Sequence, residues 1–175
     1  MKYNPELHNR QTIRLRGYNY SKDGFYFITL CCKDMEQMFG VVENELMILN
    51  DAGLMIKKWY KELENKFENI NLHEMVVMPN HIHFIVEIES KHNIIDSDDI
   101  GSPKQTISRL VQWFKTMTTN EYIVGIKTKK WKPFRRKLWQ RNYYEHIIKN
   151  YDSFIKISKY IINNPKNWEN DKYYE

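Results

Sequence analysis

The order in which strand-like and helix-like patterns follow one another is the feature that most constrains the fold of this chain. Runs of aromatic and β-branched residues predict strands, and apolar residues at three- and four-residue spacing predict helices. Along the sequence these patterns predict a strand over 25–32, a hairpin over 39–49, a helix over 51–67, strands over 71–78 and 81–89, a helix over 104–118, a short strand within 138–143 and a helix over 152–163. Because strands and helices do not alternate as regular βαβ units, we predict an α+β fold. It would be a ferredoxin-like antiparallel sheet packed with helices, plus an added C-terminal helix.

Length and composition indicate one domain that spans residues 1–175. A chain of 175 residues with 42% hydrophobic and 28% charged residues can bury one full core, and it is short for two domains. No apolar run is long enough to span a membrane, and the N-terminal residues are polar. The two cysteines, Cys31 and Cys32, are adjacent and form no disulfide framework. We therefore expect a cytoplasmic protein with reduced thiols.

Charge is divided unevenly along the chain. Residues 1–100 hold 11 Lys and Arg against 16 Asp and Glu, a net charge of −5, whereas residues 101–175 hold 16 against 6, a net charge of +10. The sign changes at an acidic stretch over 90–102, which we expect to be a mobile loop. This asymmetry predicts a face that binds a polyanion, with a merely solvated basic surface as the alternative.

Two histidines lie side by side at the start of one predicted strand. The two-residue period of a strand puts His81 and His83 on one face and Ile82 and Phe84 on the other. Two neighbouring imidazoles can hold one metal ion, although a third donor must then come from elsewhere in the chain. Oxygen donors would favour Mg²⁺ or Mn²⁺ over Zn²⁺. The alternative is that both histidines lie on a partly exposed sheet face and bind nothing.

A basic segment over 127–141 interleaves cations with aromatic rings. It contains eight Lys and Arg and no acidic residue, with rings at Trp131, Phe134 and Trp139. Cations for phosphates and flat rings for bases are typical of proteins that bind single-stranded or distorted nucleic acid. The rings are also candidates for core anchors. Near the N-terminus, Arg14 and Arg16 belong either to the same binding surface or to an arm that packs on the sheet.

The last predicted helix carries Tyr160 and Asn164 on one face, four residues apart. A tyrosine beside a metal site can act as a nucleophile once its phenol loses a proton. The apolar residues Phe154, Ile157 and Ile161 indicate that this helix packs on the sheet, where a tyrosine is usually part of the core. The residues alone therefore do not single out Tyr160 among the twelve tyrosines.

Four stretches, taken in order, resemble one family: the REP-associated tyrosine transposases, within the single-tyrosine HUH transposases. They are RLRGYNY over 14–20, VMPNHIH over 77–83, LWQRNYYEH over 138–146 and YIINNP over 160–165. The resemblance implies a ferredoxin-like domain that acts as a metal-dependent endonuclease and strand transferase on single-stranded, hairpin-forming DNA. The reaction would proceed through a covalent 5′-phosphotyrosine intermediate.

The same resemblance assigns roles to individual residues. Tyr160 would be the nucleophile, and His81, His83 and Asn164 would hold a divalent metal, Mg²⁺ or Mn²⁺. The DNA contacts expected from the resemblance and from the basic segment are Arg14, Arg16, Arg135, Arg136, Lys137, Trp139, Gln140, Arg141, Tyr143 and His146. The expected partner is single-stranded or hairpin DNA, with no small-molecule substrate, and we favour a monomer over a homodimer.

Two other functions remain open from the sequence. One is a nucleic-acid-binding module that recognises DNA hairpins without cutting them. The other is a metallohydrolase that uses the histidines with water as the nucleophile. A protein–DNA adduct that resists denaturation, and that is lost on replacement of Tyr160, distinguishes the transferase from both.

Overall fold

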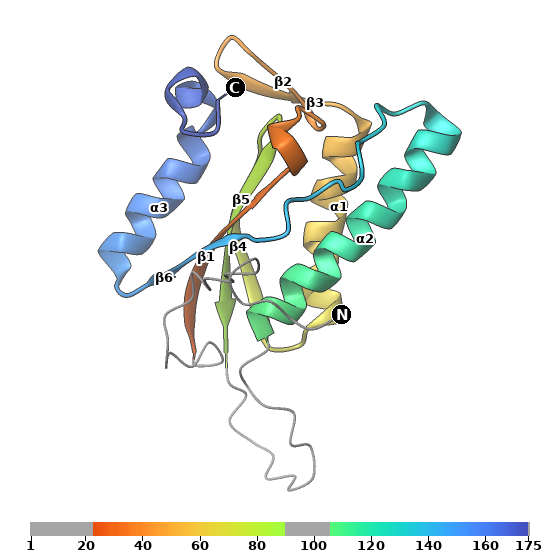
Figure 1. Ribbon diagram of the computed structural model, residues 1–175. Helices are drawn as coiled ribbons and strands as arrows, with labels where there is room; N and C mark the ends of the chain where they lie inside the picture. The colour runs from red at the N-terminus through yellow and green to blue at the C-terminus, as the bar shows by residue number, and fades with distance from the viewer. Residues whose placement is uncertain (1–22, 90–105, 175) are drawn as a thin grey trace, which may run out of the picture.

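The computed structural model describes residues 23–89 and 106–174 (Figure 1). Its elements, in chain order, are β1 (Gly24–Cys31), a 3₁₀ turn (Lys33–Met35), β2 (Gly40–Glu43), β3 (Leu46–Leu49), α1 (Asp51–Lys66), β4 (Ile70–Val77), β5 (His81–Ile88), α2 (Thr106–Lys129), β6 (Tyr144–Ile148), α3 (Tyr151–Asn163) and a 3₁₀ helix (Pro165–Asn170). The acidic stretch 90–102 and the N-terminal Arg14 and Arg16 lie outside the described residues.

The main sheet has four strands in the order β4-β5-β1-β6, and every neighbouring pair is antiparallel. Leaving out the separate β2–β3 hairpin, the chain order of the core elements is strand, helix, strand, strand, helix, strand. This is the ferredoxin-like arrangement. The predicted α+β fold class is confirmed.

Helices cover both faces of this sheet, as Figure 1 shows, with α1 and α2 on one side and α3 on the other. The larger core lies under α1 and α2 and receives Ile82, Phe84 and Val86 of β5. The smaller core lies under α3, where Ile85 of β5 meets Ile161 of α3. Because both faces of β5 are covered, its two histidines are buried rather than set on an exposed sheet face.

Two element boundaries differ from those predicted. Helix α2 runs on to Lys129 rather than ending near residue 118, because Tyr122 and Ile126 continue the apolar face and pack on the core. The last strand, β6, begins at Tyr144 and not within 138–143, since it is residues 144–148 that pair with β1. The segment before it makes one isolated bridge, between Trp139 and Cys32.

Candidate functional site

The two histidines of β5 face each other across a short distance. Residues two apart on a strand share a face, so the imidazoles of His81 and His83 lie next to each other, with their Nε2 atoms 3.1 Å apart. Two adjacent ligands at about 2.1 Å from one divalent ion, seen from the ion at roughly a right angle, are about 3 Å apart. The observed separation therefore suits a shared metal ion.

The other ring nitrogen of each histidine is held by a buried polar partner. Nδ1 of His81 lies 2.8 Å from Oδ1 of Asn80, and the Asn80 amide nitrogen donates to the backbone oxygen of Tyr173 at 2.8 Å. That donation leaves Oδ1 of Asn80 to accept from His81, so the His81 Nε2 carries a lone pair. Nδ1 of His83 lies 2.8 Å from Oγ1 of Thr29, which faces it across the β1–β5 pair. Such outer partners are typical of metal-binding histidines.

Burial keeps both imidazoles uncharged at neutral pH. It lowers the pKa of His81 and that of His83, and the charge of Lys172 lowers each further. Neutral imidazole is the form that binds metal. Neither imidazole therefore has to lose a positive charge before a metal ion binds.

A third donor comes from the segment after α3. One ligand atom from each of His81, His83 and Asp171 lies within 4.8 Å of the other two. The 3₁₀ helix over 165–170 turns the chain back and brings Asp171 to the histidines. Sequence reasoning missed Asp171, because a single aspartate seven residues beyond Asn164 carries no motif.

Asn164 also belongs to this cluster. It keeps helical backbone angles at the end of α3 (φ −57°, ψ −41°), although Pro165 follows it. Its amide nitrogen donates to Oδ2 of Asp171 at 2.7 Å. Its Oδ1 is buried and finds no hydrogen-bond partner in the described part of the chain. A buried oxygen without a partner fits the ligand role predicted for Asn164.

The Tyr160 hydroxyl lies within the same cluster. Its oxygen is 3.2 Å from Nε2 of His83, and it donates to Oδ2 of Asp171 at 3.3 Å. The side chain is 41% exposed, so a substrate can approach it. Partial burial raises the pKa of the phenol above its ordinary value, and the charge of Asp171 raises it further. The tyrosine is therefore neutral at physiological pH unless positive charge is added nearby.

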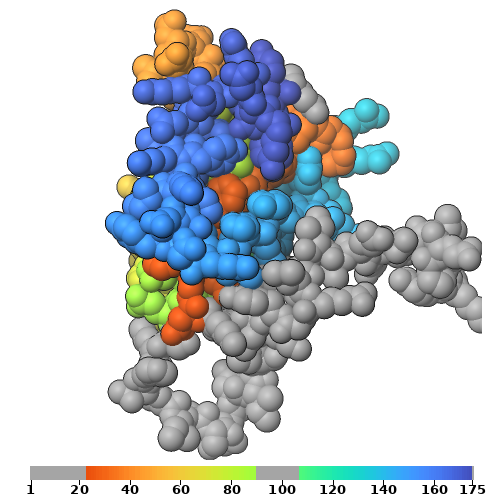
Figure 2. All heavy atoms as spheres, turned by 90° about the vertical axis from the view of Figure 1, so that its left-hand side faces the viewer, coloured from red at the N-terminus to blue at the C-terminus, as the bar shows by residue number. Residues whose placement is uncertain are grey.

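Figure 2 views the molecule from the α3 side. The α3 helix and the C-terminal segment, in two shades of blue, lie over the sheet, and red atoms of β1 show between them and the lighter blue segment that leads into β6. The β1–β5 register accounts for this neighbourhood, since Thr29 lies opposite His83 and Cys31 opposite His81. The cluster therefore joins two central strands, α3 and the C-terminal segment.

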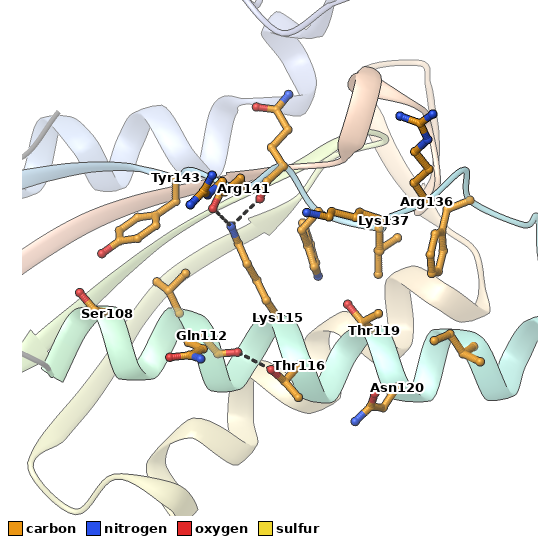
Figure 3. A pocket seen from close by; sticks show the side chains of 16 residues that line it. Ser108, Gln112, Lys115, Thr116, Thr119, Asn120, Arg136, Lys137, Arg141 and Tyr143 are labelled. Carbon is orange, nitrogen blue, oxygen red and sulfur yellow. Dashed lines mark hydrogen bonds between the residues drawn. The ribbon is translucent and has the colours of Figure 1, made fainter. Parts of the chain in front are cut away.

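A second feature is a groove of about 540 Å³ between α2 and residues 134–143 (Figure 3). Six of the residues predicted to contact DNA line it: Arg136, Lys137, Trp139, Gln140, Arg141 and Tyr143. Of the other predicted contacts, Arg135 and His146 are exposed and outside this lining. The structure thus gathers most of the described part of the predicted DNA surface along one face of α2.

Trp139 was predicted to contact DNA, but its ring is not exposed. It is only 4% exposed, its indole N–H donates to Oγ1 of Thr118 at 2.9 Å, and its ring packs against Phe39 and Phe114. The ring is thus a core anchor that forms the floor of the groove. Trp131 and Phe134 likewise pack against Tyr122. The core-anchor interpretation therefore describes these rings, and the cations remain at the surface.

Lys115 is a groove residue that the sequence did not single out. Its ammonium donates to the backbone oxygens of Gln140 at 2.8 Å and Arg141 at 3.4 Å (Figure 3). It also donates to the backbone oxygen of Asn142 at 3.2 Å. Burial lowers the pKa of Lys115 to about 8. A lysine fixed by three consecutive carbonyls fastens this wall of the groove to α2.

Comparisons with known proteins place the chain within a family and a fold. An uncharacterized protein of Haemophilus influenzae is 40% identical to it over 187 aligned positions, which cover 99% of this chain and 97% of the relative. The chain belongs to the same family as this Haemophilus protein. No protein-family model matches the chain.

A solved structure supplies the fold comparison. The REP-associated tyrosine transposase bound to a REP hairpin aligns with a TM-score of 0.54 and 19% identity, covering 90% of this chain and 74% of the transposase chain. The chain therefore has the fold of that transposase, and the fold implied by the four sequence stretches is confirmed. No helix in residues 23–89 or 106–174 is long and apolar enough to cross a membrane.

Proposed function

We propose that this protein is a metal-dependent, transposase-like nuclease and strand transferase that acts on single-stranded, hairpin-forming DNA through Tyr160. The observation that carries the proposal is the Tyr160 hydroxyl 3.2 Å from Nε2 of His83, in one cluster with His81 and Asp171. The hairpin substrate is suggested by the REP hairpin to which the structurally similar transposase is bound. The cations along the groove support a nucleic-acid partner.

The proposed metal ligands are the two imidazoles and two side-chain oxygens. His81 and His83 offer Nε2, Asp171 offers a carboxylate oxygen, and Asn164 offers the buried Oδ1 that has no other partner among the described residues. A mixed nitrogen and oxygen set suits Mg²⁺ or Mn²⁺. When bound, such an ion supplies positive charge for the scissile phosphate and for the ionised phenol.

The chain itself contributes the nucleophile and its orientation. Tyr160 Oη forms a bond to the phosphorus, the bond from phosphorus to the 3′ oxygen breaks, and a 5′-phosphotyrosine and a free 3′-hydroxyl result. The proton that the phenol gives up is balanced by the proton that the 3′ oxygen takes. Two contacts orient the phenol of Tyr160. Its hydroxyl donates a hydrogen bond to Asp171, and its ring makes a T-shaped contact with the Phe27 ring, with the two ring centroids 6.1 Å apart. The phosphotyrosine bond keeps the energy of the phosphodiester for rejoining.

The test is a search for a covalent adduct. The protein is incubated with labelled single-stranded hairpin DNA and Mg²⁺ or Mn²⁺, and the mixture is run on a denaturing gel. We expect an adduct with the wild-type protein that is absent from Tyr160→Phe and from His81→Ala/His83→Ala. Tyr151→Phe is the matched control, since Tyr151 is on the same helix and 74% exposed; it should form the adduct normally.

The alternatives predict different gels. Cleavage that survives Tyr160→Phe without an adduct would favour a metallohydrolase with a water nucleophile. Binding without cleavage, across several hairpins and both metals, would favour a non-catalytic hairpin-binding module. The raised pKa of the Tyr160 phenol favours this non-catalytic function, because a neutral phenol is a weak nucleophile.

A further inference from the structure

Tyr144, the first residue of β6, lies in the same row of the sheet as one of the clustered histidines. The strand register places Tyr144 opposite Thr29 of β1, and Thr29 opposite His83 of β5. Residues that pair directly across neighbouring strands point to the same face of a sheet, so the Tyr144 ring is on the α3 side together with the His83 imidazole. The side chain is 40% exposed, and Figure 2 shows the segment that leads into β6 at the surface of this face.

One phenylalanine ring joins Tyr144 to the proposed nucleophile. The Phe27 ring makes a T-shaped contact with Tyr160, with centroids 6.1 Å apart, and another with Tyr144, with centroids 6.3 Å apart. Because one ring makes both contacts, Tyr144 is held a single side chain away from Tyr160. A base that lies on the Tyr144 ring therefore belongs to a nucleotide close to the phosphate that Tyr160 would attack.

A second ring follows two residues along the same strand. His146 pairs with Phe27 in the β1–β6 register, and its side chain is exposed. Residues two apart on a strand share a face and are about 7 Å apart along it, so each ring has space for one base. Tyrosine and histidine rings on the surface of a sheet can stack consecutive unpaired bases. Tyr144 and His146 thus offer two such places in succession.

Positive charge lies beside the first of these rings. The Lys172 ammonium is 5.1 Å from the centroid of the Tyr144 ring and 4.7 Å from that of Tyr173, and the Lys172 side chain is exposed. A flat ring with a cation next to it provides the two groups that one nucleotide needs, a platform for the base and a counter-charge for the phosphate.

The adjacent Tyr143, which the sequence predicted to contact DNA, lies on a different surface. It lines the groove beside α2, where the Lys115 ammonium is 5.8 Å from its ring centroid. Successive residues of an extended chain point to opposite sides, which sends Tyr143 to the groove and Tyr144 toward the nucleophile. The two tyrosines therefore cannot share one role.

We propose that Tyr144 and His146 form a stacking surface for two consecutive unpaired bases of the cleaved strand, and that Tyr144 is a positioning residue that sets the scissile phosphate against Tyr160. Lys172 contacts the phosphate of the nucleotide whose base lies on Tyr144. The proposal rests on the proposed function, because it assumes that a DNA strand is cut. It concerns the strand at the nucleophile, apart from the groove between α2 and residues 134–143.

A scan of single abasic sites tests this stacking surface. Each probe is a labelled hairpin oligonucleotide with single-stranded flanks that lacks one unpaired base, and its binding to Tyr160→Phe protein is measured by fluorescence anisotropy, so that no probe is cut. We expect the absence of the base that stacks on Tyr144 to weaken binding roughly tenfold, the scale of one stacked base. When Tyr144→Leu is added, the absence of that base should no longer matter, because leucine keeps an apolar contact with Phe27 but offers no aromatic face. A purely structural role of Tyr144 would instead weaken the binding of all probes equally.

Further variants separate the two rings and connect binding with cleavage. Tyr144→Phe and Tyr144→Trp keep a ring and should keep the abasic effect, whereas His146→Ala should remove the effect at the neighbouring position alone. Tyr151→Leu is the matched control, since Tyr151 is a 74% exposed tyrosine on α3, and it should leave the whole profile unchanged. With Tyr160 present and the DNA saturated with protein, Tyr144→Leu should slow formation of the covalent adduct roughly tenfold, and Tyr144→Phe should not.

Two results would overturn the proposal. One is an abasic profile that is the same in folded Tyr144→Leu protein as in its parent. The other is a dependence on Tyr144 at positions remote from the bond that the wild-type protein cuts. Failure of the proposed function gives a different pattern: an abasic effect that Tyr144→Leu abolishes, without an adduct on any hairpin, would reject the nuclease and keep the stacking surface. A wild-type adduct with an unchanged abasic profile would reject the stacking surface and keep the nuclease.

Discussion

At the scale of single residues, the candidate metal cluster depends on buried polar groups whose partners come from distant parts of the chain. Thr29 of β1 holds Nδ1 of His83, and Asn80 links His81 to the backbone of Tyr173. Thr29 and Asn80 are 1% and 0% exposed, so removing either hydroxyl or amide would leave a histidine nitrogen without its partner. The orientation of both imidazoles is therefore set by residues that never touch a substrate.

Lys115 supports a pH-dependent prediction at this scale. Its pKa is about 8 in the folded protein, below the ordinary 10.5, so between these values the unfolded chain holds a proton that the folded chain has released. Stability then rises with pH in that window. We expect the stability of the wild type, measured relative to Lys115→Met by urea unfolding, to increase from pH 8 to pH 10.

Lys115→Met removes both the titrating group and the donor to the carbonyls of residues 140–142, so the prediction concerns how the stability difference between the two proteins changes with pH. Comparison with Lys115→Met subtracts the other groups that titrate in alkali. A constant difference between the two proteins across this pH range would contradict the prediction.

At the scale of elements, α2 has two functions in the fold: one face closes the core and another forms a wall of the groove. The helix passes through Gly125, and the indole of Trp131 packs directly over that glycine. The backbone N–H of Trp131 donates to the Gly125 oxygen at 3.3 Å, so the chain turns sharply back along the helix here. This turn starts the basic segment on its path toward the groove.

Gly125→Ala should therefore destabilise the protein, although alanine favours a helix by about 1 kcal/mol. A Cβ at this position would overlap the Trp131 ring, and relieving the overlap should cost about 1–3 kcal/mol more than alanine gains. The measurement is the free energy of unfolding in urea. In a Trp131→Ala background the same substitution should become stabilising, and a destabilising effect there would show that the ring is not the cause.

At the scale of the whole molecule, the two halves of the sequence meet in one cluster. The histidines come from the half with net charge −5, whereas Tyr160, Asn164 and Asp171 come from the half with net charge +10. The antiparallel pairing of β6 with β1 and the packing of α3 on that sheet join them. The acidic half of the chain thus supplies the strand that carries the histidines. The basic half supplies the segments that carry the proposed nucleophile and the groove cations.

A divalent ion bound at this junction should stabilise the whole domain. At a free concentration a hundred times its Kd, Mn²⁺ should add about 2.7 kcal/mol and raise Tm by several degrees in a thermal-shift measurement, and a chelator should reverse the rise. The increase should disappear in His81→Ala/His83→Ala and shrink in Asp171→Asn. His73→Ala is the matched control, since His73 pairs instead with Glu87. An equal increase in the double histidine variant would place the metal elsewhere.

The sequence determined more of the fold than of the site. Alternating and helical apolar patterns have fixed periods, so they identified β1, β5, α1 and α3 to within a residue or two. They were less successful for α2 and β6, whose limits depend on tertiary partners: the core contacts of Tyr122 and the pairing with β1.

Only the tertiary structure decided which polar side chains lie close together in one site. The pair at His81 and His83 follows from strand period alone, which is local, whereas Asp171 reaches it because the chain reverses after Pro165. The same limit of sequence reasoning applies to Trp139 and Lys115. Whether an aromatic ring or a lysine side chain is buried or exposed is known only once its neighbours in the fold are known. The apolar period of a strand or helix depends only on residues that are near one another in the sequence. Contacts between distant segments depend instead on how the folded elements pack against one another.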